Sequence, residues 1–409
     1  MKLSPTLRML IPLWLGWFLL LYGFQALTQA RFEFVRPDRA VPWAEFETKA
    51  DSNKGKIYLL EPFMNAQVAW DSEYYIGIAV GGYDDPAAGK VSTQASQTPV
   101  IKNYSFFPFY PALMAVLKYP FYLFGLNPIA AATAAGALIS LLGTLAGMVA
   151  LYELTRGLLD DSGAYRAAFY MLIFPTAFFF AMIYTEGTFV GLAFWSLLLA
   201  KRRHWLWAGV LAALAAFTRA HGAALALPLF MLWWQQTDPA NRLASLRAGR
   251  GWLPVVAAFM PLAAYAIWRV SPLGQGWALL QPGYFSRGLL NLKGTLDSIN
   301  YIFPHAFTVS SAGVTLGIEL FTVLLTAAAA LWLWRRDAAL AAFSLAVVFL
   351  SVLSGSFQSL ARYMLIAPAL YIFLAHLGQN KTFDRLWTMA SVLLMGMLAA
   401  LFAVDFWVG

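Results

Sequence analysis

Long apolar segments recur along the whole chain and alternate with short polar turns. A helix needs about 20 apolar residues to cross the ~30 Å hydrocarbon core of a bilayer. On this pattern we expect about eleven spans, at 8–29, 128–155, 164–182, 185–201, 204–219, 221–236, 251–269, 312–334, 338–354, 360–377 and 386–406. The sequence therefore predicts an all-α polytopic membrane protein in which residues 1–409 form a single membrane domain.

Two longer polar stretches interrupt this series, at 30–127 and 270–311. The first contains an apolar segment at 105–125 that is long enough to be a span. It carries three prolines and a central Lys118, however, and these suit an interfacial or re-entrant helix better than a crossing one. We therefore predict two large loops on one face of the membrane, the first of which carries this interfacial helix.

Basic residues in the short loops predict which face that is, because cytoplasmic loops are enriched in lysine and arginine. The basic clusters are Lys2/Arg8, Arg156/Arg166, residues 201–203, Arg242/Arg247/Arg250, residues 335–336 and Lys381/Arg385. If all of them are cytoplasmic, the expected spans alternate without a violation. The two large loops then lie on the extracytoplasmic face.

Composition agrees with a membrane protein and removes several other classes. Charged residues make up 12% of the chain, about half the share in a soluble domain. The net charge of +8 fits basic cytoplasmic loops, so we expect no nucleic-acid partner. There is no cysteine for a thiolate metal site or nucleophile, and the four histidines show no metal-ligand spacing.

Polar residues collect at the extracytoplasmic ends of the predicted spans. Ionisable side chains at membrane depth are costly and usually mark functional sites. The candidates are Asp71, Glu73, Tyr184, Glu186, Arg219, His221, His305, Arg362 and Tyr363, together with the aromatic residues Trp70, Tyr74 and Tyr75 beside Asp71.

Several candidates also have a simpler structural explanation; Glu186, for example, can cap its own helix together with Thr185. Asp71 can cap a helix, and Glu73 can complement the dipole of the helix's first turn. Arg219 can extend to lipid headgroups. The aromatic residues can form an interfacial belt, and His221 and His305 can be purely structural.

Transfer of a sugar from a lipid-phosphate donor would use these side chains together. The departing phosphate needs cations, which Arg219 and Arg362 supply with His221 beside them. The incoming hydroxyl must lose its proton, for which Asp71 can serve as general base. A retaining scheme would need a second carboxylate, which Glu73 can supply. The remaining candidates would bind the substrate: Trp70, Tyr74, Tyr75, Tyr184, Glu186, His305 and Tyr363.

Four segments between about 70 and 375 resemble, in the same order, the motifs of PIG-V-like mannosyltransferases. They are WDSEYYIGIAVGGYD with SFFPFYPAL, FPTAFFFAMIYTEGTF, LAALAAFTRAHGAAL and SLARYMLIAPALYIFLA. These are GT-C fold enzymes related to the second mannosyltransferase of GPI-anchor assembly, with many prokaryotic members. The resemblance implies a polyprenyl-phosphate-linked donor carrying mannose, and a catalytic aspartate at Asp71. The acceptor, a lipid or a glycan, stays open.

Two positions depart from the family pattern. Glu73 stands where the family usually has a small residue, and His221 stands where an apolar residue is common. They would tune donor or acceptor binding. We expect no obligatory metal, because two arginines suffice for a monophosphate donor, although Glu73 beside Asp71 leaves a divalent cation conceivable.

Three other functions compete with this one. A transporter or lipid flippase would place polar residues near mid-membrane on paired broken helices. A different membrane-face enzyme, such as an oligosaccharide-lipid ligase or a lipid phosphatase, would use another set of catalytic groups. A non-catalytic assembly subunit would tolerate loss of Asp71. The expected protein is an inverting glycosyltransferase of the GT-C type, embedded among membrane lipids.

Overall fold

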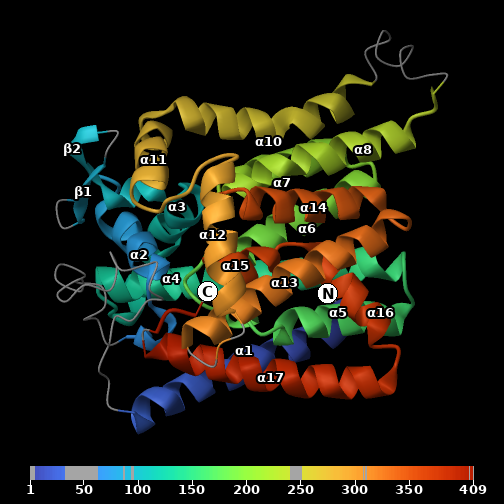
Figure 1. The fold of residues 1–409 in the computed structure, drawn as a ribbon, viewed down its shortest axis with the longest axis horizontal. Coiled ribbons are helices and arrows are strands. Elements are labelled where there is room, and N and C mark those ends of the chain that lie inside the picture. Colours follow the sequence, from blue (N-terminus) through green and yellow to red (C-terminus); the bar gives the residue numbers. More distant parts are fainter. Residues whose placement is uncertain are drawn as a thin grey trace.

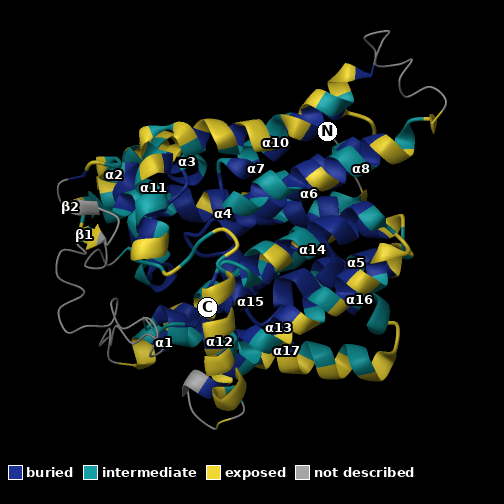
Figure 2. Cartoon of the chain, turned by 45° about the horizontal axis from the view of Figure 1, so that its top comes forward, coloured by how far each residue is buried: buried dark blue, intermediate teal, exposed yellow. Residues whose placement is uncertain are grey.

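The chain folds into a bundle of helices with a small two-stranded sheet at one end (Figure 1). A computed structural model describes residues 5–32, 63–85, 88–93, 96–239, 251–306, 308, 311–404 and 406–408. Buried residues concentrate in the middle of the bundle, whereas the outer faces of α10 (Trp252–Val270) and α17 (Lys381–Ala403) carry many exposed ones (Figure 2). Many of these exposed side chains are large and apolar, as expected for helices that face lipid.

Five helices of the described chain are long and apolar enough to cross a membrane. They are α1 (Pro5–Arg31), α4 (Pro128–Arg156), α10, α13 (Ser311–Trp334) and α17. Each coincides with one of the eleven expected spans. The all-α membrane fold predicted from the sequence is therefore confirmed, and the chain is an integral membrane protein.

The other six expected spans contain shorter or interrupted helices. These are α5 (Asp161–Ile173), α6 (Glu186–Lys201), α7 (Trp205–Ala216), α8 (Ala226–Gln236), α14 (Ala338–Val352), and the pair α15 (Leu360–Met364) and α16 (Pro368–Leu377). A 3₁₀ helix, η6 (Ala177–Phe180), follows α5, and another, η7 (Ala220–Leu225), precedes α8.

Two of these interruptions meet inside the bundle. The chain leaves helical geometry at Phe174, directly before Pro175, and α16 starts only at Pro368. Proline lacks a backbone N–H and restricts the residue before it, so helices commonly end or begin there. The hydroxyl of Thr176 in the first break donates to the carbonyl of Ala361 in α15 (3.2 Å). This bond ties the break after α5 to the short helix α15.

Helices α4 and α6 pack backbone against backbone. A Cβ added to Gly143 would lie 2.6 Å from the carbonyl oxygen of Gly187, and one added to Gly187 would lie 2.3 Å from that of Ser140. Small residues allow membrane helices to approach this closely. The first turn of α6, which carries Glu186, is therefore fixed against α4.

Helix α6 runs between two differently charged ends of the bundle. At its carboxyl end, Lys201 pairs with Asp337, and Arg202 pairs with Glu153 at 2.7 Å. Sixteen residues span about 24 Å, so its amino end, at Glu186, lies on the opposite side. Ion pairs bring four of the predicted basic clusters to this end: Arg156 pairs with Glu153, Lys201 with Asp337 beside residues 335–336, and Arg166 with Asp384 beside Arg385. Residues 242–250 lie outside the described residues.

The first predicted loop is more structured than its composition suggests. It contains η3 (Asn65–Gln67), α2 (Asp71–Gly81), β1 (Lys90–Thr93), β2 (Ser96–Ile101) and η4 (Lys102–Ser105). The two strands form an antiparallel hairpin, in which Lys90 pairs with Ile101. The segment predicted as an interfacial helix consists of α3 (Phe109–Leu117) and η5 (Tyr119–Phe124), both short.

The second predicted loop is largely helical. It contains α11 (Pro272–Gly283) and α12 (Leu292–His305), and α12 lies across the direction of the neighbouring helices (Figure 1). The turn between them is tied to the segment after α14. Gly288 donates its N–H to the carbonyl of Ser354 (2.8 Å), and Asn291 donates to that of Leu353 (2.9 Å). These helices form one wall of the site described next.

Candidate active site

Asp71 begins α2 and is held in place through its backbone. Trp70, which precedes it, has a φ of 57°, a left-handed conformation that is uncommon for a residue with a side chain. The N–H of Asp71 donates to the Tyr184 hydroxyl (3.2 Å), which in turn donates to the carbonyl of Ala69 (3.0 Å). Tyr184 therefore pins the turn that presents Asp71.

The Asp71 carboxylate is part of a chain of charged side chains. Arg362 Nη1 donates to Asp71 Oδ2 at 2.7 Å, and its Nε lies 3.5 Å from Glu186 Oε1. Glu186 also pairs with Arg219, whose Nη1 donates to the Thr185 hydroxyl (3.2 Å). Because buried charges are costly unless paired, the four groups stabilise one another. Asp71 is the most exposed of them, at 21% of its side chain.

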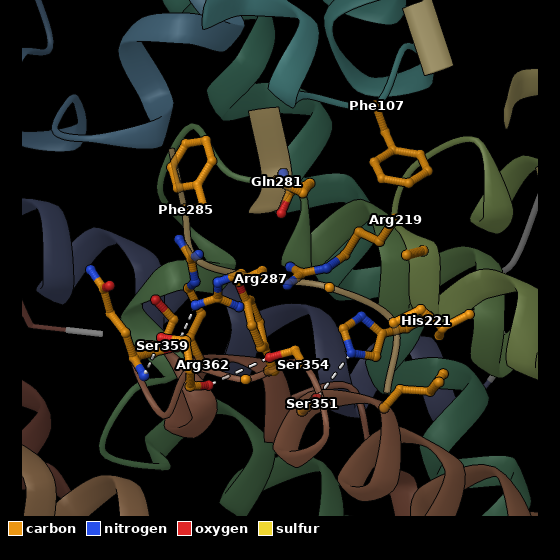
Figure 3. Close-up of a pocket in the computed structure, with 18 of the residues that line it drawn as sticks. Phe107, Arg219, His221, Gln281, Phe285, Arg287, Ser351, Ser354, Ser359 and Arg362 are labelled. Carbon is orange, nitrogen blue, oxygen red and sulfur yellow. Dashed lines mark hydrogen bonds between the residues drawn. The ribbon is translucent and has the colours of Figure 1, made fainter. Parts of the chain in front are cut away.

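Three arginines surround the ring of Tyr363. The guanidinium carbons of Arg219, Arg287 and Arg362 lie 5.0, 4.9 and 5.3 Å from its centroid. These distances are within the range of cation–π attraction. Figure 3 shows Arg219 and Arg287 approaching each other from different segments of the wall. The arrangement concentrates positive charge at one place in the cavity.

Sequence reasoning did not find Arg287 or Glu319. Glu319, in α13, accepts the backbone N–H groups of Ser359 (2.9 Å) and Ala361. It thereby caps α15, which starts after Ser359 at a φ of 66° and carries Arg362. Glu319 is the single acidic residue in the predicted span 312–334, a signal that was available. Nothing in the sequence separates Arg287 from the other basic residues of its loop.

The charged network and the arginines around Tyr363 line a cavity of about 1070 Å³. One part of its wall is polar and includes Asp71, the arginines and the serines that follow α14. Another part is apolar and includes Leu227 and Phe230 of α8 and Phe259 and Leu262 of α10. Leu227, Phe259 and Leu262 are exposed side chains. The cavity therefore combines a charged end with an apolar side.

Seven of the predicted site residues line this cavity: Asp71, Tyr75, Glu186, Arg219, His221, Arg362 and Tyr363. His221 Nε2 is 2.9 Å from the Ser351 hydroxyl. Burial raises the pKa of Tyr75, and the nearby carboxylates of Asp71 and Glu186 raise it further. Tyr75 therefore remains a neutral phenol that can donate a hydrogen bond but cannot serve as a base.

The other five predicted residues lie outside the lining. Trp70 packs edge-on against Trp407, with ring centroids 5.1 Å apart, and Tyr74 stacks on Phe106 at 4.8 Å. Tyr184 supports Asp71 from behind, as described above.

Glu73 and His305 are the remaining two. Glu73 is 4% exposed and sits within α2, two residues after Asp71. His305 is exposed at the end of α12 and stacks on Tyr301. Within the described residues, no group of three or more histidine, aspartate or glutamate side chains is arranged to hold a metal ion.

No family model and no curated protein sequence matches the chain. Among solved structures, it is similar to the oligosaccharyltransferase of Archaeoglobus fulgidus. The crystal structure with zinc and sulfate has 18% identity and a TM-score of 0.44, over 82% of this chain and 49% of that one. The apo form has 15% identity and a TM-score of 0.45, over 96% and 56%.

A third structure is the same archaeal enzyme in complex with an inhibitory peptide and a dolichol-phosphate. It has 13% identity and a TM-score of 0.42, over 95% of this chain and 56% of that one. The chain thus spans about half the length of these structures. At such TM-scores the likeness is loose, and the fold described above rests on the chain's own helices.

Proposed function

We propose that the chain is an inverting glycosyltransferase of the GT-C type that moves a sugar from a polyprenyl-phosphate donor to an acceptor hydroxyl. The observation that carries this proposal is the position of Asp71. Its carboxylate stands on the wall of a large cavity, held by Arg362 at 2.7 Å, where an arginine cluster and an apolar surface meet. A general base, a phosphate site and a lipid site are thereby combined in one space.

Asp71 is suited to accept the proton of the attacking hydroxyl. Its Oδ2 accepts from Arg362, while its Oδ1 has no hydrogen bond among the described residues. In the proposed reaction the acceptor oxygen bonds to the anomeric carbon as the bond from that carbon to the phosphate oxygen breaks. The hydroxyl proton passes to Asp71, and the lipid phosphate leaves with the electron pair. Attack from the face opposite the phosphate inverts the configuration.

The departing phosphate gains negative charge, so it needs positive charge that is already in place. Arg219 and Arg362 supply this charge, and both are fixed by Glu186 before any substrate binds. His221 lies beside Arg219 on the same wall. Preorganised cations of this kind stabilise the transition state without having to move during the reaction.

The positions of the carboxylates favour inversion over retention. Retention needs a second carboxylate as nucleophile at the reacting carbon. Glu73 is buried and does not line the cavity, while Glu186 is occupied by two arginines. Asp71 is then left to act as a base in a single displacement.

The apolar wall formed by α8 and α10 suits the polyprenyl chain of the donor. Its exposed residues Leu227, Phe259 and Leu262 would allow the lipid to enter from the side of the bundle. Tyr75 and Tyr363 line the polar part, where aromatic rings can stack on a sugar. Motif resemblance supports mannose as that sugar, and we propose a lipid or glycan acceptor.

We further propose that the site faces the extracytoplasmic side. The support is its separation from the basic end of the bundle, because positively charged ends of membrane proteins are usually cytoplasmic.

A transfer assay tests this proposal. The purified protein in lipid nanodiscs is given polyprenyl-phosphate-mannose and a membrane extract that contains acceptors. We expect transfer by the wild type, a loss of about 10²–10⁴-fold in Asp71→Asn, and an unchanged rate in Asp84→Asn. Asp84 is a matched control, because it lies in the same loop and bonds to Tyr104 instead. Equal transfer by Asp71→Asn would reject the assigned base, and absence of transfer from any lipid-linked sugar would favour a transporter.

A further inference from the structure

Arg287 differs from the other two arginines around Tyr363 because it pairs with no carboxylate among the described residues. Arg362 pairs with Asp71 and Glu186, and Arg219 pairs with Glu186. Arg287 makes no ion pair within the described part of the chain. Its Nη2 donates to the backbone carbonyl of Gln358 at 2.6 Å, and its guanidinium faces the Tyr363 ring.

The backbone keeps this guanidinium at the cavity. Gly288, the next residue, is bonded to Ser354, and Asn291 is bonded to Leu353. The hydroxyl of Ser298 in α12 adds a bond to the carbonyl of Gly355 (3.0 Å). The segment that carries Arg287 is therefore fixed to the cavity wall at several points.

The positive charge of Arg287 is not balanced by an ion pair among the described residues. Arg219 and Arg362 are like charges around the same ring, and a carbonyl oxygen supplies no negative charge to offset them. Two acidic residues, Glu319 and Asp297, lie in this part of the structure, and Asp297 lines the same cavity. Glu319 directs both oxygens at backbone N–H groups, and the exposed Asp297 forms no ion pair among described residues. The cavity thus contains a cation, Arg287, with which a bound anion would form an ion pair.

We propose that Arg287 binds the phosphate of the lipid-linked donor directly, with the planar guanidinium donating to two of its oxygens. This inference rests on the proposed function. Arg219 and Arg362 add positive charge at the same place, but each already faces a carboxylate, Glu186 or Asp71. Arginine matches phosphate oxygens in this forked geometry, whereas lysine acts as a point charge. The ligand chemistry is a phosphate group, carried either by a lipid or by free inorganic phosphate.

Binding measured without any transfer tests this assignment. The full-length protein in nanodiscs is titrated with undecaprenyl phosphate, with undecaprenol, which lacks the phosphate, and with inorganic phosphate. The variants are Arg287→Gln and Arg287→Lys, with Arg336→Gln as the matched control. Arg336 also stacks on an aromatic ring (Trp332, 4.0 Å) and donates to a carbonyl (2.9 Å), but it lies at the basic end.

We expect Arg287→Gln to bind undecaprenyl phosphate roughly ten- to a hundredfold more weakly, the range for a lost charge-assisted hydrogen bond. Its affinity for undecaprenol should not change, and Arg336→Gln should bind as the wild type does. Arg287→Lys should fall between the two. Inorganic phosphate should compete only weakly, because it lacks the apolar chain.

Each contrary result has a separate meaning. An unchanged preference for the phosphate over the alcohol in Arg287→Gln overturns the assignment of Arg287 and leaves the proposed function standing. A wild type without that preference overturns both. If inorganic phosphate competes for the site as well as undecaprenyl phosphate does, the conclusion that the ligand is a lipid phosphate is overturned. If Arg287→Gln does not fold, wild-type affinity in Arg287→Lys overturns the two-bond contact.

Discussion

Arg362 Nη1 donates to Asp71 Oδ2 over 2.7 Å and so joins two residues that are 291 positions apart in the chain. The contact connects α15, in the interrupted span 360–377, to the first turn of α2. It fixes one oxygen of the proposed base, and the other has no hydrogen bond among the described residues. The orientation of Asp71 and the position of α15 therefore depend on each other.

Removing both partners of this pair should cost less than the sum of the two single removals. Arg362→Gln leaves the carboxylates of Asp71 and Glu186 without their shared cation, so we expect the free energy of unfolding to fall by about 3–5 kcal/mol. Adding Asp71→Asn should cost less than the sum of the single changes, with a coupling of about 0.5–3 kcal/mol. Unfolding of the four proteins in mild detergent measures the cycle.

The control for that cycle is Arg156→Gln. Arg156 pairs with Glu153 at 3.9 Å, and its side chain is half exposed, so we expect a change within about 0.5 kcal/mol. Strictly additive effects of the Asp71 and Arg362 changes would show that the two residues are not coupled.

Glu319 should act as a positioning residue for Arg362. Glu319→Ala leaves the N–H groups of Ser359 and Ala361 without an acceptor, at about 1–3 kcal/mol for each. Because α15 then loses its cap, we expect kcat for transfer to fall tenfold or more, since small displacements at a catalytic site are costly. Glu319→Gln retains one carbonyl acceptor and should recover part of the loss.

Thr326→Val on the same helix is the comparison for Glu319, because the Thr326 hydroxyl bonds only to the carbonyl one turn earlier (2.7 Å). Steady-state kinetics and thermal unfolding should show little change in this variant. A wild-type kcat in Glu319→Ala would mean that Arg362 is positioned by other contacts.

The contact between α4 and α6 should not tolerate an added methyl group. In Gly187→Ala the Cβ would lie 2.3 Å from the Ser140 carbonyl oxygen and 2.5 Å from the Thr144 hydroxyl. We expect a loss of stability of about 1–3 kcal/mol, and reduced transfer because Glu186 is the preceding residue. The control is Gly23→Ala in α1, which meets nothing within 4 Å. Its stability should match or slightly exceed that of the wild type, and equal melting temperatures for both variants would contradict this packing.

The chain has no cysteine, so single introduced cysteines can report which side of the membrane the site faces. Leu289→Cys lies beside Arg287 at a position that is 80% exposed, and Gln379→Cys lies at the exposed turn before α17. We expect a membrane-impermeant maleimide to label the first in intact cells and the second only after permeabilisation. The reverse pattern would place the site on the cytoplasmic side.

Much of the fold follows directly from the apolar pattern. A run such as 128–155 has few ways to hide its side chains, and it forms α4 as predicted. The breaks within 164–182 and 360–377 were harder to predict, because both segments stay apolar through them. They depend on proline and on partners distant in sequence, such as the bond from Thr176 to Ala361. The helices of 270–311 were missed because that stretch is less apolar and alternates with polar residues.

In the site, too, some features follow from the sequence and others depend on contacts between distant residues. Chemistry and membrane orientation were enough to group Asp71, Glu186, Arg219 and Arg362, and the structure brings these four into one network. Which carboxylate pairs with which arginine depends on helix packing that no local pattern encodes. Glu73 illustrates this limit. Two positions after Asp71 on a helix, it points away from the cavity, since residues so spaced do not share a face.

The order of the charged residues along the chain also constrains how the protein is made. Asp71 and Glu186 are synthesised before Arg219, and Arg362 follows more than a hundred residues later. A partly synthesised chain therefore presents two carboxylates to the membrane before their shared cation exists. Carboxylates without partners are poorly tolerated in hydrocarbon, so α2 can settle into its final place only late in biogenesis. Insertion of the last third of the chain is then the step that completes the candidate site.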